Sequence, residues 1–551
     1  IGERTMLKET WNYTWPEYFW KLFSEADMAY NATAFWIVLP IFLGIYLLLR
    51  NQTAKRVWIL FGSIIFYIWS GPAALAIVLG TSLIIYGITR RIDGIYSKYD
   101  VEKDGLSPKE QAVLFACYKK KTLKYVWLAL VLILGIWIAV KVGKLLEFDT
   151  VETFVEMFSG TGIIVPLGIS YYTLSSVGYL MDVYWRKTKP EKNILNLISA
   201  MIYFPHIMQG PISKYQDLIS QMKNLPSVEY NRVCYGLQLM VWGYIKKMVI
   251  ADRLVLYTAT VFATPKDFAG VEVLIAVILC TIQLYADFSG CMDIVRGISQ
   301  VLGIELAENF RQPFFAKSAQ EFWARWHITL GTWTKDYIYL PIAMNPKFMK
   351  CTRNLKKSGK AWLSSFLKAF CPLITVWIFT GLWHGTGVDY LVWGLYWCTI
   401  MTLSKELEPL GKKMVGKLRI NTEAVYYKKW MSIRTVMFFG IGRMFTVTGS
   451  LAGCLVLWKQ LFSESRVWTL FDGSLYTYGL DQKDFYVALV GIFVMFWVDT
   501  MHEKGVSIRA SLAAQPLVLR WIVYYAAILT VVIFGMYGPG FDASSFVYGA
   551  F

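Results

Sequence analysis

The chain of 551 residues is 56% hydrophobic and 17% aromatic, and only 17% of its residues are charged. This balance, with a mean hydropathy of +0.43, excludes an ordinary soluble globular protein and predicts a polytopic membrane protein. In a soluble chain, the formal net charge of +17 would suggest nucleic acid as a partner. Here the Lys and Arg residues stand in short segments beside apolar runs, as in cytoplasmic loops of membrane proteins. We therefore expect a lipid bilayer as the partner and no nucleic acid.

Residues 1–29 are mixed and aromatic and lack an uninterrupted apolar core. They predict an N-terminal interfacial segment on the extracytoplasmic side rather than a cleavable signal peptide. The first candidate span, residues 30–49, is followed at once by basic residues, and residues 90–124 form a longer basic loop. The positive-inside rule puts both basic segments in the cytoplasm, and the N-terminus therefore outside.

Two apolar segments, residues 165–172 and 203–211, are broken by Pro and Gly and predict re-entrant elements, because irregular backbone at membrane depth is tolerated only where protein or a water-filled cavity covers it. Further candidate spans occur over residues 57–69, 73–89, 126–140, 236–251, 271–285, 370–382, 391–401, 436–457, 485–498 and 518–536. Together they predict an all-α, polytopic integral membrane protein with roughly ten to twelve membrane helices, broken elements included, around a central cavity. We expect a single transmembrane domain over residues 30–551, with its central catalytic stretch at residues 285–397.

The familiar catalytic and metal-binding motifs are absent from the sequence. The eight cysteines are scattered without a C-x-x-C pair, and so predict neither a disulfide framework nor a metal site. No G-x-S-x-G, H-E-x-x-H or G-x-x-x-x-G-K-[ST] motif supports a hydrolase, zinc-protease or P-loop interpretation. The four histidines become the candidates, because ionisable groups at membrane depth are kept mainly where they face a cavity or a path.

Two of the four histidines, His327 and His384, each follow a tryptophan directly. A histidine exchanges a proton near neutral pH and a neighbouring indole adds apolar bulk, so each Trp-His pair is suited to hold a base in a partly dry site. For His384 the alternative is a packed histidine at a helix end, with Gly381 and Gly385 allowing close helix approach. For His327 the alternative is an interfacial ion network that includes Arg325.

The other two histidines are expected to have other roles. His206, which stands between prolines, is interpreted as structural or interfacial, and His502, at a charged helix end, as solvated. The polar residues that precede the first Trp-His pair either line a cavity or cap short helices. The candidates for the lining of a cavity are Trp383, Trp326, Arg325, Asn309, Asp287 and Lys335.

The order of six short motifs in this chain resembles that of the membrane-bound O-acyltransferase family, in its bacterial branch typified by alginate O-acetylation. The motifs occupy residues 165–173, 204–211, 285–290, 308–313, 322–327 and 381–385. The resemblance implies a ring of helices around a thinned membrane centre, with a cytoplasmic acyl-thioester donor and an acceptor hydroxyl on the other side. It also implies that His384 is the catalytic histidine and that His327 is the second recurrent one.

From this resemblance we expect an acyltransferase of the cell membrane with His384 as general base and no permanently bound cofactor. The expected donor is acetyl-CoA. The expected acceptor is an extracytoplasmic polysaccharide, or a partner acyltransferase of the SGNH type at the periplasmic or cell surface. Two alternatives stay open: D-alanyl transfer to teichoic acid from a carrier-protein thioester, and a transporter or flippase for a lipid-linked intermediate that does no chemistry.

Overall fold

In a computed structural model of the protein, almost every described residue is helical or irregular. The described residues are 30, 32–70, 72–145, 168–207, 209–385 and 387–537. Within these ranges the only extended pairing is a single bridge between Phe310 and Trp326. The predicted all-α class is therefore confirmed. Residues 1–29, with the expectation made for them, and the first part of the broken segment 165–172 lie outside the described residues.

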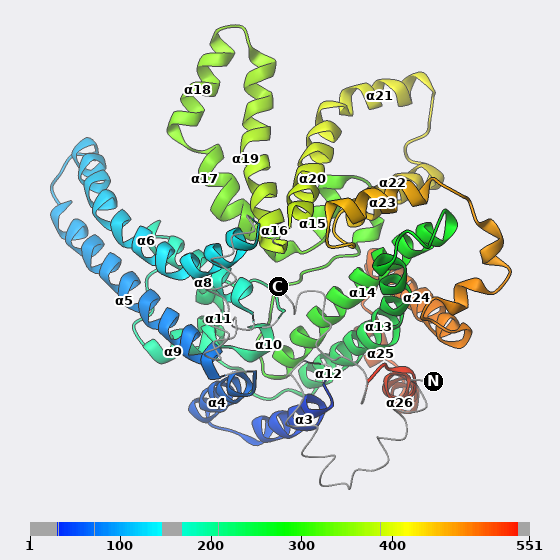
Figure 1. Ribbon diagram of the computed structural model, residues 1–551. Helices are drawn as coiled ribbons and strands as arrows, with labels where there is room; N and C mark the ends of the chain where they lie inside the picture. Colours follow the sequence, from blue (N-terminus) through cyan, green and yellow to red (C-terminus); the bar gives the residue numbers. More distant parts are fainter. Residues whose placement is uncertain are drawn as a thin grey trace. The chain divides into compact units, whose positions relative to one another are not determined.

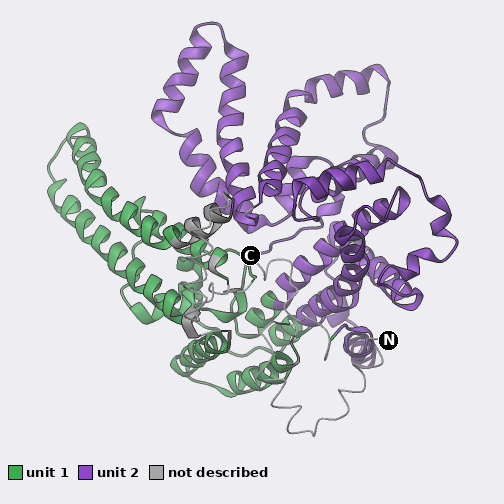
Figure 2. Cartoon of the chain, in the orientation of Figure 1, with its two compact units in different colours: residues 1–237, 295–307, 537–551 green, residues 238–294, 308–536 purple. Residues whose placement is uncertain are grey.

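The chain divides into two compact units (Figure 2). Unit 1 comprises residues 1–237, 295–307 and 537–551, and unit 2 comprises residues 238–294 and 308–536. The division passes through helices α12 and α14, so each unit is built from discontinuous stretches of chain. The single domain expected over residues 30–551 stays a prediction.

Unit 1 is a set of paired helices (Figure 1), of which α5 and α6 form the longest hairpin. Its helices are α3 (Thr33–Leu48), α4 (Gln52–Ser70), α5 (Pro72–Glu102), α6 (Pro108–Leu145), α8 (Ile169–Tyr184), α9 (Ile194–Met201), α10 (Phe204–Ile207), α11 (Tyr215–Lys223) and most of α12 (Tyr230–Tyr244). Buried tyrosines join these helices, because a phenol adds apolar area and still places its hydroxyl on a backbone acceptor. The hydroxyl of Tyr30 donates to the Phe204 carbonyl over 2.9 Å, and that of Tyr46 to the Leu302 carbonyl over 2.5 Å.

Unit 2 contains the stretch expected to be catalytic. Its long elements are α13 (Asp252–Ala263), α14 (Val271–Val301), α18 (Pro346–Lys357), α19 (Ala361–His384), α20 (Val388–Glu406), α21 (Glu408–Lys417), α22 (Val425–Met444), α23 (Leu451–Leu461), α24 (Gln482–Glu503) and α26 (Leu517–Phe534). Its short elements are η1 (Ile245–Ala251), η2 (Pro313–Phe315), α15 (Ala319–Arg325), α16 (Ile328–Thr334), η3 (Lys335–Tyr339), α17 (Leu340–Ala343), η4 (Val467–Leu470), η5 (Ser474–Thr477) and α25 (Ile508–Ala513).

Helices α19 and α20 approach each other closely, because glycine occupies both sides of their contact. A Cβ built on Gly381 would lie 2.5 Å from the Tyr390 carbonyl oxygen, and one on Gly394 would lie 2.5 Å from that of Trp377. Neither position has room for a side chain. Gly381 therefore allows the close helix approach named in the alternative interpretation of His384. This packing role does not exclude a catalytic role for His384, three residues later.

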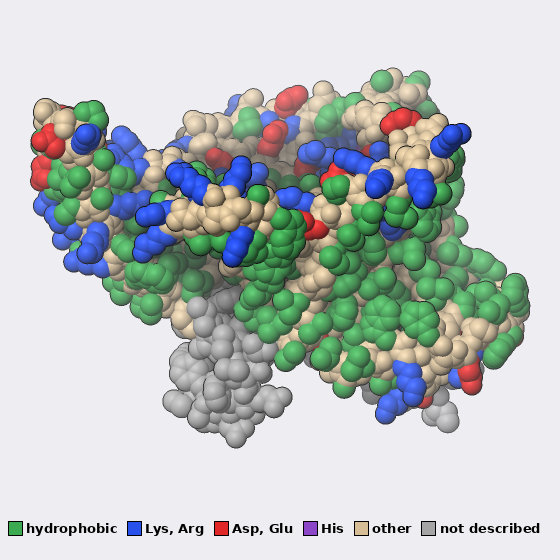
Figure 3. Space-filling view, turned by 90° about the horizontal axis from the view of Figure 1, so that it is seen from above, with side chains coloured by type: hydrophobic (Ala, Val, Ile, Leu, Met, Phe, Trp, Pro, Cys, Tyr) green, Lys and Arg blue, Asp and Glu red, His purple; other side chains and the backbone are tan. Residues whose placement is uncertain are grey.

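Five described helices are long and apolar enough to cross a membrane. They are Leu75–Glu102, Val271–Val301, Ala361–His384, Gln482–Glu503 and Leu517–Phe534, and shorter apolar helices cover Ala34–Leu48, Ile194–His206 and Leu451–Leu461. Figure 3 shows broad hydrophobic areas on one face, with Lys and Arg side chains gathered along their borders. The protein is a multi-pass membrane protein, whereas the count of ten to twelve membrane elements and the central cavity stay predictions.

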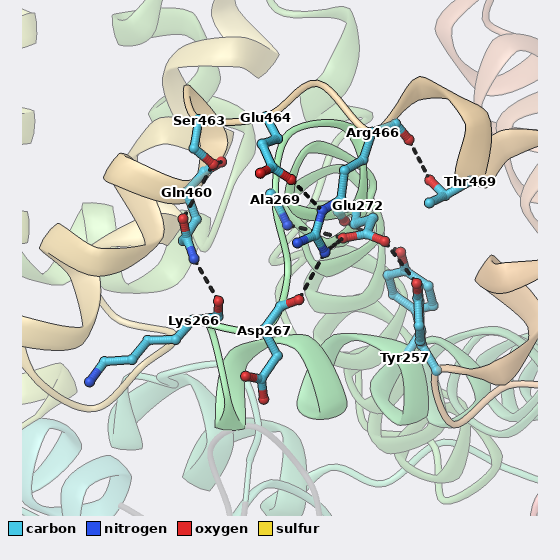
Figure 4. A network of polar contacts seen from close by, with 11 residues as sticks. Tyr257, Lys266, Asp267, Ala269, Glu272, Gln460, Ser463, Glu464, Arg466 and Thr469 are labelled. Carbon is cyan, nitrogen blue, oxygen red and sulfur yellow. Dashed lines mark hydrogen bonds and ion pairs between the residues drawn. The ribbon is translucent and has the colours of Figure 1, made fainter.

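A buried carboxylate fastens the segment after α23 to the start of α14 (Figure 4). Glu272, 1% exposed, accepts hydrogen bonds from the Tyr478 hydroxyl at 2.7 Å and from the Ala269 amide at 3.0 Å, and it pairs with Arg466 at 3.2 Å. Arg466 also donates to the Asp267 carbonyl over 2.9 Å. Arg466 and Tyr478 are thereby both tied to the start of α14.

Candidate active site

His327 stands in the turn between α15 and α16, and neighbouring backbone fixes its direction. Phe310 and Trp326 form the isolated bridge, and the Ile328 amide donates to the Asn309 carbonyl over 3.0 Å. His327 itself is left-handed, with a φ of 47°, which is costly for a residue with a side chain. Such a conformation persists where the surrounding contacts impose it, so this imidazole is positioned by the fold.

The side chain of Asn309 assigns the tautomer of His327. Its Oδ1 accepts hydrogen bonds from the Thr329 amide at 3.0 Å and the Thr329 hydroxyl at 2.9 Å, so this atom acts as an acceptor. His327 Nδ1 lies 3.2 Å from the same oxygen and therefore carries the proton. Nε2 is then the basic nitrogen of His327, because a neutral imidazole has one donor and one acceptor.

His327 is held neutral by its surroundings. It is 2% exposed, and the Phe288 ring packs edge-on against it with centroids 4.8 Å apart. His327 lies outside the five candidate spans, and burial lowers the pKa of its imidazole to about 3, because an apolar setting disfavours the charged form. A neutral imidazole is the form that can accept a proton.

His384 is the last residue of α19 and lies beside His327. It is 7% exposed, and it packs edge-on against Trp383 and Trp393, with centroids 4.8 and 5.2 Å away. The rings of His384 and His327 have centroids 6.4 Å apart, and Trp383 also lies 5.9 Å from His327. The fold thus brings the two histidines together, and the indoles of Trp383 and Trp393 pack around them.

A cluster of buried charges fixes the helix that supports His327. Lys247, 1% exposed, pairs with Asp287 at 2.6 Å and Asp252 at 2.8 Å, and Lys246 pairs with Asp293 at 2.6 Å. Both lysines belong to η1, a π-helix, and α14 supplies both Asp287 and Asp293. Asp287 directly precedes Phe288, so the ion pairs hold in place the ring that packs on His327.

The remaining predicted lining residues have different positions. Trp326 is buried, with its ring 5.0 Å from that of Phe310, behind the His327 turn. Arg325 pairs with Glu503 at 2.6 Å and Glu321 at 2.8 Å, and Lys335 is exposed. Of the predicted set, the structure gathers His384, Trp383 and Asn309 around His327. Asp287 belongs to the adjacent charge cluster.

The structure places the other two histidines, whose roles stay predictions. His206 is buried in unit 1, with its ring 5.4 Å from that of Tyr203, and His502 is exposed. Sequence reasoning missed the role of Trp393 and of the two lysines in η1. The two adjacent lysines inside an apolar run could have indicated this charge cluster, because buried cations are usually paired with carboxylates.

These features define a helical membrane protein with two buried, neighbouring histidines, one of which has an assigned tautomer. Comparison with known proteins gives the family. The model of the membrane-bound O-acyltransferase family matches residues 191–352, which include His327 and Asn309. A probable alginate O-acetylase of Pseudomonas putida is 30% identical over 373 residues, 67% of this chain and 69% of that protein. The chain belongs to the membrane-bound O-acyltransferase family.

Other relatives are named as transferases of acyl groups to cell-wall polymers. A peptidoglycan O-acetyltransferase of Helicobacter pylori is 26% identical over 396 residues, 65% of this chain and 66% of that protein. A teichoic acid D-alanyltransferase of Bacillus subtilis is 27% identical over 249 residues, 45% of this chain and 60% of that protein. The match to a probable alginate O-acetylase of Pseudomonas syringae spans 64% of that relative's length.

Proposed function

We propose that this protein passes an acetyl group from acetyl-CoA to a hydroxyl of an extracytoplasmic polysaccharide, or to a partner acyltransferase outside the cell membrane. The observation that carries the proposal is the pair of buried imidazoles, 6.4 Å apart between ring centroids, within a wall of indoles. Family membership supports acyl transfer. The names of the relatives from Pseudomonas and Helicobacter support acetyl as the group transferred.

His384 is the proposed general base. The acceptor oxygen attacks the thioester carbonyl carbon while its proton moves to the neutral imidazole of His384. The carbon–sulfur bond then breaks, and the CoA thiolate takes the proton back from the imidazolium. His327 is the proposed positioning partner, because Asn309 fixes its ring and directs Nε2 as an acceptor. The indoles exclude water, which would otherwise compete with the acceptor hydroxyl.

The charge distribution within unit 2 supports the proposed direction of transfer. The segments joined to the first turn of α19 and the last turn of α20 are rich in Lys and Arg, whereas His384 closes the other end of α19. The positive-inside rule assigns the basic ends to the cytoplasm. An anionic CoA thioester would then approach from the basic side, and the base would stand toward the acceptor.

An assay with labelled acetyl-CoA tests this function in nanodiscs that contain the purified full chain. We expect release of CoA that depends on acceptor and is lost in His384→Ala. D-Alanyl transfer is the second candidate, favoured by the relative from Bacillus subtilis, and a carrier-protein D-alanyl thioester replaces acetyl-CoA in its assay. Absence of release from either donor, with polysaccharide, teichoic acid and partner supplied, would favour a transporter or flippase instead.

A further inference from the structure

An apolar groove of about 190 Å³ lies between α3 and α4 in unit 1, and neither histidine of the candidate active site lines it. Its floor is aromatic. The rings of Phe42 and Phe66 lie 5.4 and 5.8 Å from that of Phe204, and each of the three is at most 9% exposed. This cluster packs against itself and leaves a recess that faces outward.

The recess is built by a glycine and a hydrogen bond. A Cβ on Gly62 would lie 2.4 Å from the Phe42 ring, so only glycine lets this ring lean onto α4. Trp58 stacks on Phe42 at 5.4 Å between centroids, and its Nε1 donates to the Phe42 carbonyl over 3.0 Å. The ring that forms the floor is therefore held from two sides.

The rims of the groove are bulky and exposed. Ile41 and Ile45 stand one turn apart on α3 and are 60% and 38% exposed, and Phe61 and Ile65 stand one turn apart on α4 at 48% and 38%. Helices that associate in membranes present small residues, so that their backbones can approach closely. These four large side chains disfavour such an approach, whereas the apolar space between them suits a flexible acyl chain.

One end of the groove is cationic. Ile45 and Trp58 line that end, and the chain between them carries Arg50, Lys55 and Arg56 without a single Asp or Glu. Lys55 is buried and lies 5.3 Å from the centroid of the Tyr46 ring. Arg50 is exposed and Arg56 half-buried, so these two guanidinium groups can contact a ligand from outside.

We propose that this groove binds one chain of an anionic glycerophospholipid from the bilayer, with the phosphate between Arg50 and Arg56. The apolar rims and floor hold the acyl chain by burial, and the guanidinium groups pair with phosphate oxygens. The positive-inside rule places residues 50–56 at the cytoplasmic leaflet, where a basic segment meets the negative surface potential. The site does not depend on acyl transfer.

Native mass spectrometry of the full chain in detergent tests the headgroup. Phosphatidylglycerol and phosphatidylcholine with identical acyl chains are the probes, added separately at matched concentrations. We expect wild type to retain phosphatidylglycerol on the order of tenfold better, given two basic side chains at the site. Arg50→Gln with Arg56→Gln should lower its retention to that of phosphatidylcholine. Lys109→Gln with Lys120→Gln, which removes two exposed cations from α6, should leave the preference unchanged.

Two pairs of tryptophan substitutions test the groove itself. Ile41→Trp with Ile65→Trp fills the space between the rims, and we expect retention of both lipids to fall. Ile37→Trp with Ile68→Trp adds the same bulk to exposed positions of the same helices outside the groove, and should behave as wild type. Equal retention of the two lipids by wild type would overturn the proposal. Equal retention of phosphatidylglycerol by the two tryptophan variants would overturn it as well.

Discussion

His384, at the end of α19, and His327, in the turn before α16, have ring centroids only 6.4 Å apart. If His384 is the base, His384→Ala should keep the fold and donor binding but lower the turnover number by about 10²–10⁴. His327→Ala should lower it less or change the Michaelis constant for the donor. Steady-state kinetics with labelled acetyl-CoA, and donor binding by calorimetry, measure both effects. Full activity of a well-folded His384→Ala variant would refute the assignment.

Asn309 should matter through the tautomer of His327. Asn309→Ala removes the acceptor for Nδ1, so the ring can exchange its donor and acceptor nitrogens, and we expect a loss of about 10-fold or more in turnover. Thr329→Val is the matched control, because it removes one hydrogen bond to Asn309 and leaves the contact between Asn309 and His327. NMR of 15N-labelled histidine in both variants reports the tautomer. An unchanged tautomer in Asn309→Ala would contradict this role.

The stability of the folded protein should fall as the pH is lowered, because His327 is buried in its neutral form. Its folded-state pKa of about 3 lies below the value of about 6.5 expected in an unfolded chain. Between these values the unfolded state binds the extra proton, so acidification from pH 6.5 favours unfolding by up to about 1.4 kcal/mol per pH unit. His327→Gln should show a shallower fall in unfolding temperature between pH 7 and 5. Parallel pH profiles for the two proteins would show that His327 is not the group responsible.

Donor binding should weaken with salt if the basic segments steer an anionic thioester. Exposed charges are screened over about 8 Å at physiological ionic strength, so the association rate should fall as salt rises. Lys335 is exposed and is one candidate, and Arg325 is already paired with two carboxylates. Stopped-flow measurements of acetyl-CoA binding at several salt concentrations provide the check. A rate that does not depend on salt would leave the basic segments as signals of topology only.

Glu272 should control the order of residues 464–478. Glu272→Gln removes the buried charge that pairs with Arg466, and we expect faster proteolysis of this segment and a loss of about 1–3 kcal/mol in its local stability. Glu464→Gln removes the exposed carboxylate, 3.3 Å from the same Arg466, and should change stability by less than about 1 kcal/mol. Hydrogen exchange across residues 464–478 separates the variants. Equal exchange in both would mean that burial of Glu272 adds nothing.

The sequence by itself determined the class of fold. A long apolar run in a bilayer has no water to bind its backbone N–H and C=O groups, and a helix pairs these groups with each other. The all-α membrane fold therefore followed from composition. It also selected His327 and His384, because a histidine beside a tryptophan in an apolar region is rare in this chain. Their common site could not be read from spacing, since four helical elements, α16, η3, α17 and α18, lie between the first motif and α19.

Only the tertiary structure decided which polar groups act together. The acceptor for His327 Nδ1 is the side chain of Asn309, and the backbone bridge between the adjacent residues Phe310 and Trp326 brings the two together. The role of Lys247 follows from its carboxylate partners on α13 and α14. Arg325 and Lys335 were both candidates by sequence, but Arg325 is held by two carboxylates and Lys335 is exposed. Hydrogen bonds and ion pairs depend on distances of a few ångströms, which packing between remote helices sets and local sequence does not encode.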